Sequence, residues 1–205
     1  MKHILKTFIA FATLVVAQDS TMNVEKEPSL PGWGVYVGGA FGNATAVDDL
    51  PDGTNLESRL VLPNIGVTKG LMLGPVPLIV GFGYHPRGYT YKRTGDSESV
   101  DYAVEADYQI DMLDFWATVP YPVSDRAILQ AGFLVGTCLG GKVTIDGDDT
   151  DLEDIEGEPD FGIMLGGGFA ITEQVGVNCA YYIGLAEFDD LYKFNGLVFN
   201  LGYNF

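Results

Sequence analysis

Residues 194–205 read FNGLVFNLGYNF, and this stretch decides the fold. Five apolar or aromatic side chains fall at every second position, with valine, glycine and asparagine between them: Leu197, Phe199, Leu201, Tyr203 and Phe205. Alternation with period two is typical of a β-strand that has one apolar face. The sequence therefore predicts a strand that runs to Phe205.

The same alternation recurs along the chain. It is found at about residues 34–41, 61–67, 78–87, 104–119, 127–139, 161–171 and 175–185. In the fourth of these stretches the phase slips near Leu113, as a β-bulge in that strand would cause. With residues 197–205 the sequence predicts eight antiparallel strands.

The composition of the two faces indicates the solvent that each one meets. One face is broad, apolar and aromatic, whereas the other consists mostly of glycine, alanine, asparagine and glutamine, which is unusual for a face exposed to water. We therefore predict an all-β, eight-stranded antiparallel up-and-down transmembrane β-barrel with its apolar face toward lipid. The lipid-facing belt is predicted to contain Leu129, Phe133, Ile163, Leu165, Val177, Tyr181, Phe199 and Leu201.

The connections between the predicted strands alternate in length. Long ones are expected at residues 43–58, 92–99, 143–159 and 189–195, and shorter ones at 69–77, 121–126 and 172–174, although 69–77 is not short. Long loops at one end and turns at the other are typical of outer-membrane barrels.

The N-terminal residues have the three parts of a secretory signal. Lys2 and Lys6 precede an apolar run, which Ala17 closes with a small residue. We predict a signal peptide at 1–17, a short lead segment at 18–32 and the barrel at 33–205. Removing residues 1–17 takes away two lysines and no acid, so the net charge changes from −17 to −19. Nucleic-acid binding is not expected, because phosphates would repel so acidic a chain.

Four stretches carry a family resemblance, namely residues 110–123, 128–142, 160–171 and 198–205. From about Trp33 to Phe205 the chain resembles the small eight-stranded outer-membrane β-barrels of Gram-negative cells, the OmpA/OmpX-like group of "porin family" proteins. The resemblance implies a cell-surface protein in outer-membrane lipid, expected to be a monomer. It also implies that Phe199, Leu201, Tyr203 and Phe205 form the signal that the barrel-assembly machinery recognises.

A group of charged residues is expected in the barrel interior. Arg87, Glu105, Asp107, Asp111 and Asp114 lie on the third and fourth predicted strands, where a guanidinium would favour the ionised carboxylates. An eight-stranded barrel has an interior that side chains just fill. We interpret this cluster as a structural ion-pair network, with a gate or catalytic group as the alternative.

An acidic loop is the strongest charge feature. It contains Asp146, Asp148, Asp149, Asp151, Glu153 and Asp154, whose oxygens are of the kind that calcium and magnesium bind. The spacing does not fit an EF-hand, because Asp151 stands where that loop requires glycine. A solvated mobile loop is the favoured interpretation, with binding of a divalent cation as the alternative.

Few residues support an enzyme. After signal removal His85 is the only histidine, and a serine triad would have to recruit Ser58, Ser97, Ser99 or Ser124. Cys138 and Cys179 are expected on opposite faces of non-adjacent strands, which excludes a disulfide.

The sequence favours a non-enzymatic barrel without a cofactor that has a structural or surface-interaction role through its loops. The alternatives are a small porin or transporter for a hydrophobic or ionic solute, an outer-membrane lipid-modifying enzyme, and a soluble lipocalin-like binder.

Overall fold

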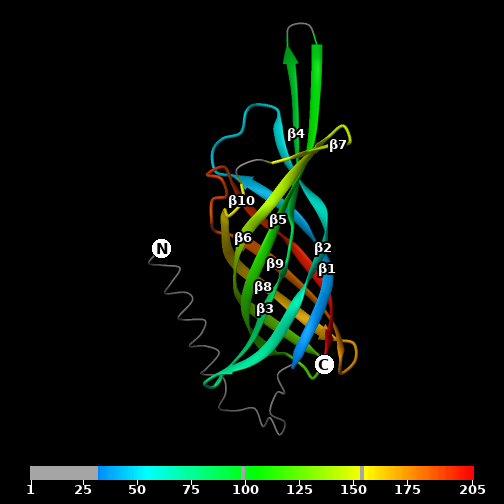
Figure 1. Cartoon of the computed structure of the whole chain (residues 1–205), viewed down its shortest axis with the longest axis vertical. Coiled ribbons are helices and arrows are strands. Elements are labelled where there is room, and N and C mark those ends of the chain that lie inside the picture. The colour runs from blue at the N-terminus through cyan, green and yellow to red at the C-terminus, as the bar shows by residue number, and fades with distance from the viewer. Residues whose placement is uncertain (1–31, 98–99, 153–154) are drawn as a thin grey trace.

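The computed structural model describes residues 32–97, 100–152 and 155–205, and the predicted signal peptide and most of the lead segment lie outside them. Figure 1 shows a tilted barrel of long strands. Within the described ranges no helix is long and apolar enough to cross a membrane. The strands are β1 (Trp33–Ala46), β2 (Thr54–Leu73), β3 (Val76–Tyr84), β4 (Arg87–Ser97), β5 (Val100–Pro122), β6 (Ala127–Ile145), β7 (Asp148–Asp151), β8 (Pro159–Ala170), β9 (Val175–Gly184) and β10 (Tyr192–Asn204).

The strands close into an eight-membered antiparallel ring, as predicted. β3 and β4 follow one another between β2 and β5, so together they form one wall strand, and β7 pairs only with the outer part of β6. The ring closes where β1 pairs with β10 from Gly34–Asn204 to Ala46–Tyr192. At the closure the Phe205 amide donates a hydrogen bond to the Trp33 carbonyl at 2.8 Å.

The two ends of the barrel differ, also as predicted. Both chain ends described, Trp33 and Phe205, lie at the end that carries the tight connections 74–75, 123–126 and 171–174, which we call the turn end. The connections 47–53, 146–158 and 185–191, together with the outer end of the β4–β5 hairpin, lie at the opposite, loop end (Figure 1). The predicted bounds of the long loops were wrong, because the strands extend far into the residues that were assigned to loops. The connection predicted at 69–77 is a two-residue turn, in which Gly74 adopts the positive φ that a primed turn requires.

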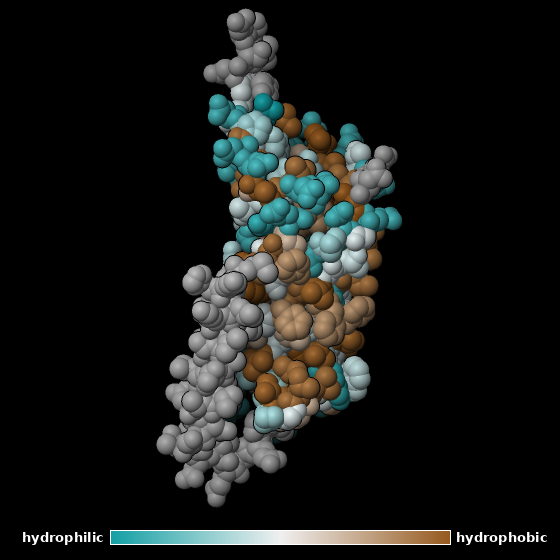
Figure 2. Space-filling model, turned by 90° about the vertical axis from the view of Figure 1, so that its left-hand side faces the viewer, coloured by the Kyte–Doolittle hydropathy of each residue, from teal (hydrophilic) through white to brown (hydrophobic). Residues whose placement is uncertain are grey.

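The apolar belt lies where the sequence places it. Figure 2 shows apolar residues gathered over the turn-end half of the barrel and hydrophilic residues over the loop-end half. Leu129, Phe133, Leu165, Val177, Tyr181 and Leu201 are all exposed, and Phe205 is 74% exposed. Exposed large apolar side chains in one continuous band are typical of a wall that faces lipid.

The predicted β-bulge lies in a different strand. The register between β5 and β6 shifts after Asp111, which pairs with Gly140, because Met112 pairs with Cys138 and leaves Leu139 of β6 as the extra residue. In β5 Ala106, Ile110, Met112 and Asp114 are all buried, so this strand keeps one phase. The change in its sequence pattern near Leu113 reflects a change of surroundings along the strand.

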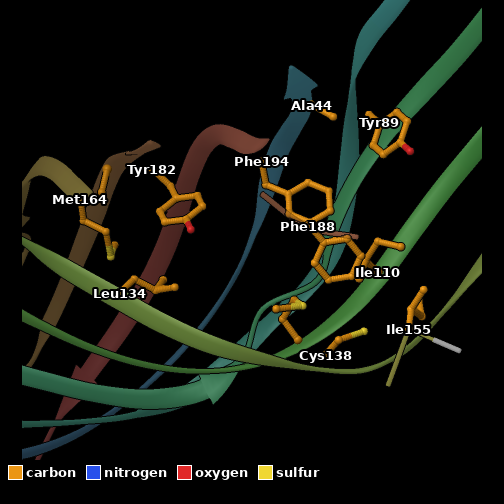
Figure 3. Packing of buried hydrophobic residues seen from close by; sticks show 12 residues of the cluster. Ala44, Tyr89, Ile110, Leu134, Cys138, Ile155, Met164, Tyr182, Phe188 and Phe194 are labelled. Atoms are coloured by element: carbon orange, nitrogen blue, oxygen red, sulfur yellow. The ribbon is translucent and has the colours of Figure 1, made fainter. Parts of the chain in front are cut away.

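The loop-end half of the interior is filled by an apolar cluster (Figure 3). It contains Ala44, Tyr89, Ile110, Met112, Leu134, Cys138, Ile155, Met164, Ala180, Tyr182, Phe188 and Phe194, which we call the upper apolar cluster. Ile155 and Phe188 come from loops, and both are buried. Phe188 packs on Phe194 with ring centroids 5.0 Å apart. Two of the loops therefore close the lumen from this end.

Candidate functional site in the barrel lumen

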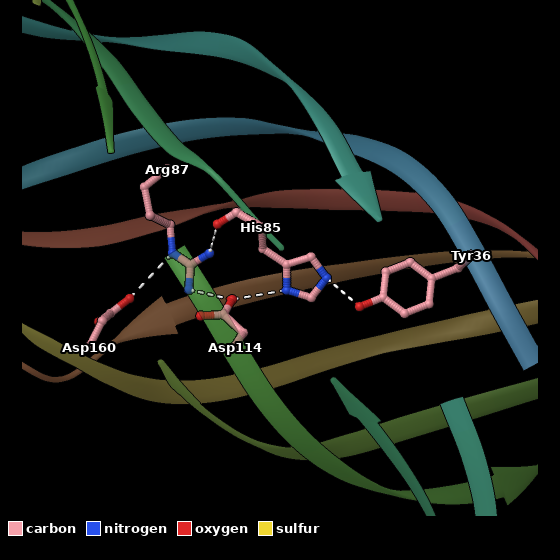
Figure 4. Close-up of polar contacts among 5 residues, drawn as sticks. All are labelled: Tyr36, His85, Arg87, Asp114 and Asp160. Atoms are coloured by element: carbon pink, nitrogen blue, oxygen red, sulfur yellow. Dashed lines mark hydrogen bonds and ion pairs between the residues drawn. The ribbon is translucent and has the colours of Figure 1, made fainter. Parts of the chain in front are cut away.

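A group of polar side chains lies inside the barrel, next to the upper apolar cluster. It consists of Tyr36 from β1, His85 from the link between β3 and β4, Arg87 from β4, Asp114 from β5 and Asp160 from β8, which we call the lumenal polar cluster (Figure 4). All five are buried. They converge because Tyr36, Arg87, Asp114 and Asp160 stand at inward positions of their strands and His85 lies directly before Arg87 in the link.

Arg87 is the centre of this cluster. Its Nη2 donates to Asp114 Oδ2 at 2.9 Å, its Nε to Asp160 Oδ2 at 3.3 Å, and its Nη1 to the His85 carbonyl at 2.8 Å. The guanidinium carbon also lies 4.8 Å from the centre of the Tyr182 ring. One cation thus joins two wall strands, β5 and β8, that are not adjacent in the ring.

His85 connects the carboxylate to a tyrosine. Its Nδ1 lies 2.9 Å from Asp114 Oδ2 and its Nε2 lies 2.7 Å from the Tyr36 hydroxyl. Both ring nitrogens are therefore occupied, and neither is available to activate a serine. Pro86 follows directly and lacks the amide hydrogen that a strand ladder needs, which agrees with the break between β3 and β4 at His85 and Pro86.

The two carboxylates are fully removed from solvent. The side chains of Asp114 and Asp160 are each 0% exposed. Gly136 makes room for one of them, because a Cβ at this position would collide with Asp114 Oδ1. Buried charges are stable only when they are paired, so Arg87 is the group on which both carboxylates depend.

A cavity of about 290 Å³ lies in the turn-end half of the lumen. Tyr36, His85 and Arg87 border it, and it reaches the turn residues Ser124 and Asp125. The upper apolar cluster occupies the loop-end half. The lumen is thus a pocket that reaches the turn end and is closed toward the loop end.

The comparison with known families decides what kind of protein has this architecture. The outer membrane protein beta-barrel domain family matches residues 8–205, nearly the whole sequence. The chain belongs to this family. It is a small β-barrel of the cell outer membrane, and its belt contacts membrane lipid. In such barrels the short turns face the periplasm and the longer loops face outward, which orients the turn end and the loop end.

One solved structure shows the same fold. The crystal structure of Neisserial surface protein A (NspA) has a TM-score of 0.53 at 13% identity, over 85% of this chain and 97% of that chain. The crystal structure of Ail, the attachment invasion locus protein of Yersinia pestis, has a TM-score of 0.45 at 12% identity, over 86% and 100%. OprG from Pseudomonas aeruginosa has a TM-score of 0.44 at 12% identity, over 86% and 97%. No curated protein sequence matches the chain.

The outer-membrane barrel brings together only part of the charged cluster predicted in its interior. Arg87 and Asp114 lie in the lumen and form an ion pair, as predicted. The interior placement of Glu105, Asp107 and Asp111 was wrong. The Glu105 side chain is 64% exposed and pairs with Lys92, and Asp107 pairs with Arg59 at 3.4 Å. Asp111 accepts a hydrogen bond from the hydroxyl of Tyr84. Neither residue is among the buried, inward-facing residues of its strand.

The physical reason is that β5 crosses two environments. In its turn-end half the outside is lipid, so apolar Phe115 points outward and Asp114 inward. In its loop-end half the outside is water, so the carboxylates point outward while Ala106, Ile110 and Met112 fill the interior. A strand that passes from lipid to water exchanges its polar and apolar faces without any change of phase.

Sequence reasoning missed Tyr36 and Asp160 as members of the site. Asp160 directly precedes the strand predicted at 161–171 and was not included in the charged cluster, although it shares the inward phase of Gly162 and Met164 in β8. That phase is the signal that could have identified it. The pairing of Tyr36 with His85 has no signal in the sequence, because 49 residues separate them.

The acidic loop contains a short hairpin that was not predicted. Asp148, Asp149 and Asp151 lie in β7, and Asp146 and Gly147 form its turn with positive φ. Lys142 Nζ and Thr144 Oγ1 each donate to Asp149 at 2.6 Å. The pKa of the Asp149 carboxyl is lowered, first by the hydrogen bond from Lys142 and then by that from Thr144. Glu153 and Asp154 lie outside the described residues.

Two further predictions can be compared with the structure. Among the described residues no group of three His, Cys, Asp or Glu side chains is placed to hold a metal ion. Cys138 is buried and Cys179 is exposed, and both are free, as their opposite phases predicted.

Proposed function

We propose that this outer-membrane barrel is a non-enzymatic surface protein that acts through its loop end. The observation that carries the proposal is the division of the molecule into a closed lumen and a hydrophilic loop-end surface. Arg87 and its partners, with the upper apolar cluster above them, close the lumen toward the loop end. Contact with an external partner would therefore be made by the outward side chains at the loop end.

The loop-end surface has an excess of carboxylates. Three of its lysines lie beside acids: Lys92 pairs with Glu57 at 3.0 Å, Lys142 with Asp149 at 2.6 Å and Lys193 with Glu187 at 3.1 Å. Carboxylates such as Asp146, Asp148 and Asp151 stay exposed. We infer a partner that is cationic, or an anionic lipopolysaccharide surface reached through divalent cations.

Adhesion tests this surface role. Cells that display the barrel should bind a polylysine-coated surface more than cells without it, and the difference should shrink as salt rises, because salt screens exposed charges. A variant with Asp146, Asp148 and Asp151 changed to asparagine should lose most of the difference, whereas the pair of Asp149 and Lys142 is kept. Equal adhesion of wild type and variant would contradict the proposal.

A small porin remains the second candidate, because a cavity reaches into the lumen from the turn end. We expect the purified barrel to give no conductance steps in planar lipid bilayers, since the upper apolar cluster closes the narrow lumen toward the loop end. A sixteen-stranded porin under the same conditions is the positive control. Regular conductance steps from the wild-type barrel would favour the porin.

The last strand is proposed to act as the signal for the barrel-assembly machinery. Phe199, Leu201 and Tyr203 share the outward face of β10, and Phe205 follows the strand in the same phase. Phe205 is 74% exposed, so it buries little surface within the barrel. Deleting Phe205 should therefore lower the folded fraction in the outer membrane, measured by heat-modifiable gel mobility, while molecules that assemble unfold nearly as the wild type does. Normal assembly with a strongly lowered unfolding midpoint would mean that Phe205 is only a wall residue. We further propose that the barrel is monomeric.

A further inference from the structure

We propose that the tip of the β2–β3 hairpin is a second membrane contact, which lies among the phospholipid headgroups of the periplasmic leaflet. We call residues 70–78 the turn-end flap. The flap consists of the last residues of β2, the turn at Gly74 and Pro75, and the first residues of β3. The surface role proposed above concerns the loop end of the barrel, so the two proposals can fail separately.

Prolines end the pairing of the flap on its β3 side. The ladder between β3 and β5 stops at the pair Ile79–Thr118, although β5 continues beside β6. Two residues further in the same register, Pro77 would lie opposite Pro120. Neither proline has the amide hydrogen that a strand ladder needs. The first residues of β3 therefore separate from the wall.

The flap leaves the wall on its β2 side as well. β1 begins at Trp33, which pairs with Lys69, and the Gly70 amide donates to the Gly32 carbonyl at 3.3 Å. Beyond this point, within the part of the chain that the structure describes, residues 71–73 pair with β3 alone. In Figure 1 the resulting two-stranded hairpin projects sideways from the barrel at the turn end.

The flap is apolar on both faces. Leu71 and Leu73 continue the outward phase of the belt residue Val67, and they are 43% and 69% exposed. Met72 has the opposite phase, which faces the lumen elsewhere in β2, and it is 61% exposed because the flap has left the ring. Exposed apolar patches mark sites that contact a protein or a membrane. A hairpin that is apolar on both faces fits lipid, which surrounds it, better than a protein surface, which covers one face.

The charge of the flap fits an anionic phospholipid surface. Lys69, at its base, is the only charged residue in the stretch 60–84, and this stretch contains none of the 28 acidic residues of the chain. Lys69 Nζ lies 5.1 Å from the centre of the Trp33 ring. Tryptophan is enriched at membrane–water interfaces, and lysine near the end of a spanning segment reaches toward the headgroups. The flap therefore begins where the wall meets the periplasmic interface.

The open edges of the flap set its depth. An open sheet edge does not occur in the hydrocarbon region, because no group there can pair with its backbone donors and acceptors. Pro77 removes one donor from the β3 edge, whereas residues 71–73 keep theirs. Water and lipid headgroups can satisfy these groups at the interface. We therefore place the flap at the level of the headgroups, with its leucines toward the acyl chains.

Fluorescence quenching tests this position. In the Trp33→Phe background Trp116, which lies inside the barrel, is the only tryptophan left and gives a constant signal. Met72→Trp then adds a reporter to the flap. In vesicles of phosphatidylethanolamine and phosphatidylglycerol, lipid brominated near the top of its acyl chains should quench most of the added emission, whereas aqueous iodide should quench little of it.

Glu173→Trp in the same background is the matched control for the position of the reporter. Glu173 is exposed in the turn 171–174, at the same end of the barrel. Its reporter should be quenched by iodide and little by brominated lipid. Leu73→Trp is a second reporter on the flap, for use if Met72→Trp does not assemble. Heat-modifiable gel mobility verifies that each variant is folded.

A second pair of variants tests whether the apolar side chains hold the flap in the lipid. Leu71→Asn combined with Leu73→Asn should remove most of the lipid quenching of the Met72→Trp reporter and make it accessible to iodide. Leu191→Asn makes the same change at an exposed residue of the loop end, and it should leave the quenching of this reporter unchanged.

Three results would overturn the proposal. Quenching of the flap reporter by iodide alone would mean that the flap lies in the periplasmic water. Quenching by neither agent would mean that protein covers the flap, either a second copy of the barrel or the segment that precedes Gly32. Unchanged lipid quenching in the folded double asparagine variant would mean that the wall, and not the apolar side chains of the flap, sets its position.

Discussion

Replacing Arg87 with alanine should lower the free energy of unfolding of the barrel by about 3–5 kcal/mol, the usual cost of leaving buried charges without their partner. Asp114 and Asp160, both fully buried, would then face each other's charge with no guanidinium between them. The measurement is the urea midpoint of the folded barrel in phospholipid vesicles, followed by Trp116 emission in the Trp33→Phe background.

Two variants make this result specific. Arg59→Ala removes a partly exposed cation that pairs with Asp107 at 3.4 Å, and it should cost less than about 1 kcal/mol. Arg87→Met combined with Asp114→Asn and Asp160→Asn removes all three charges and should recover most of the stability. If Arg87→Ala unfolded at the wild-type midpoint, the ion pairs would be hydrated and would contribute little.

Replacing Leu165 with arginine should cost about 2–4 kcal/mol, because its side chain points from the middle of β8 into the lipid belt. A cation near the bilayer midplane loses its hydration and gains no partner there. The effect is measured as the difference in unfolding free energy between wild type and variant in vesicles of one lipid composition.

Thr150→Arg is the matched control for Leu165→Arg. Thr150 lies exposed in β7, beyond the belt, so the same new charge should change the stability little. Gly166→Arg should fail for another reason, since a Cβ at Gly166 would already collide with the Cys179 carbonyl on the neighbouring strand. A Leu165→Arg barrel as stable as wild type would contradict the lipid-facing placement of this residue.

The ring and its belt could be predicted because two constraints agree in the turn-end half. There lipid requires apolar side chains outside, and the narrow lumen requires small or polar side chains inside. Leu129, Phe133 and Leu165 therefore point outward, whereas Gln130 and Gly132 point inward. The next inward residue of β6, Leu134, already belongs to the upper apolar cluster. Alternation with period two is enough to recognise such a wall.

The candidate site was harder to predict because its members depend on position along the strand as well as on phase. Asp107 and Asp114 have similar chemistry and lie on one strand, yet the first faces water and the second faces the lumen. The sequence contains no marker of the level at which lipid gives way to water. Arg87 and Asp114 could be paired from their phases, whereas the contribution of Asp160 from β8 required the closed ring.

Turn residues indicate the ends of some strands that the alternation of apolar residues does not reveal. Asp146 and Gly147 both adopt positive φ, as an Asp-Gly dipeptide does in a two-residue hairpin, so this dipeptide could have predicted the β6–β7 hairpin that the sequence analysis missed. Polar residues such as Asn43 and Lys92 were assigned to loops because they interrupt the apolar pattern. They lie in strands because a strand wetted on its outer face needs no apolar residues there.

The β4–β5 hairpin rises above the rest of the barrel in Figure 1 and stays paired from Arg87–Ile110 to Ser97–Val100. Its outer end lies far from the seam where β1 and β10 join. A foreign peptide inserted between Ser97 and Val100 would leave the wall pairing intact and would be carried away from the cell on a two-stranded stalk. The barrel therefore offers a scaffold for displaying peptide epitopes on living bacteria.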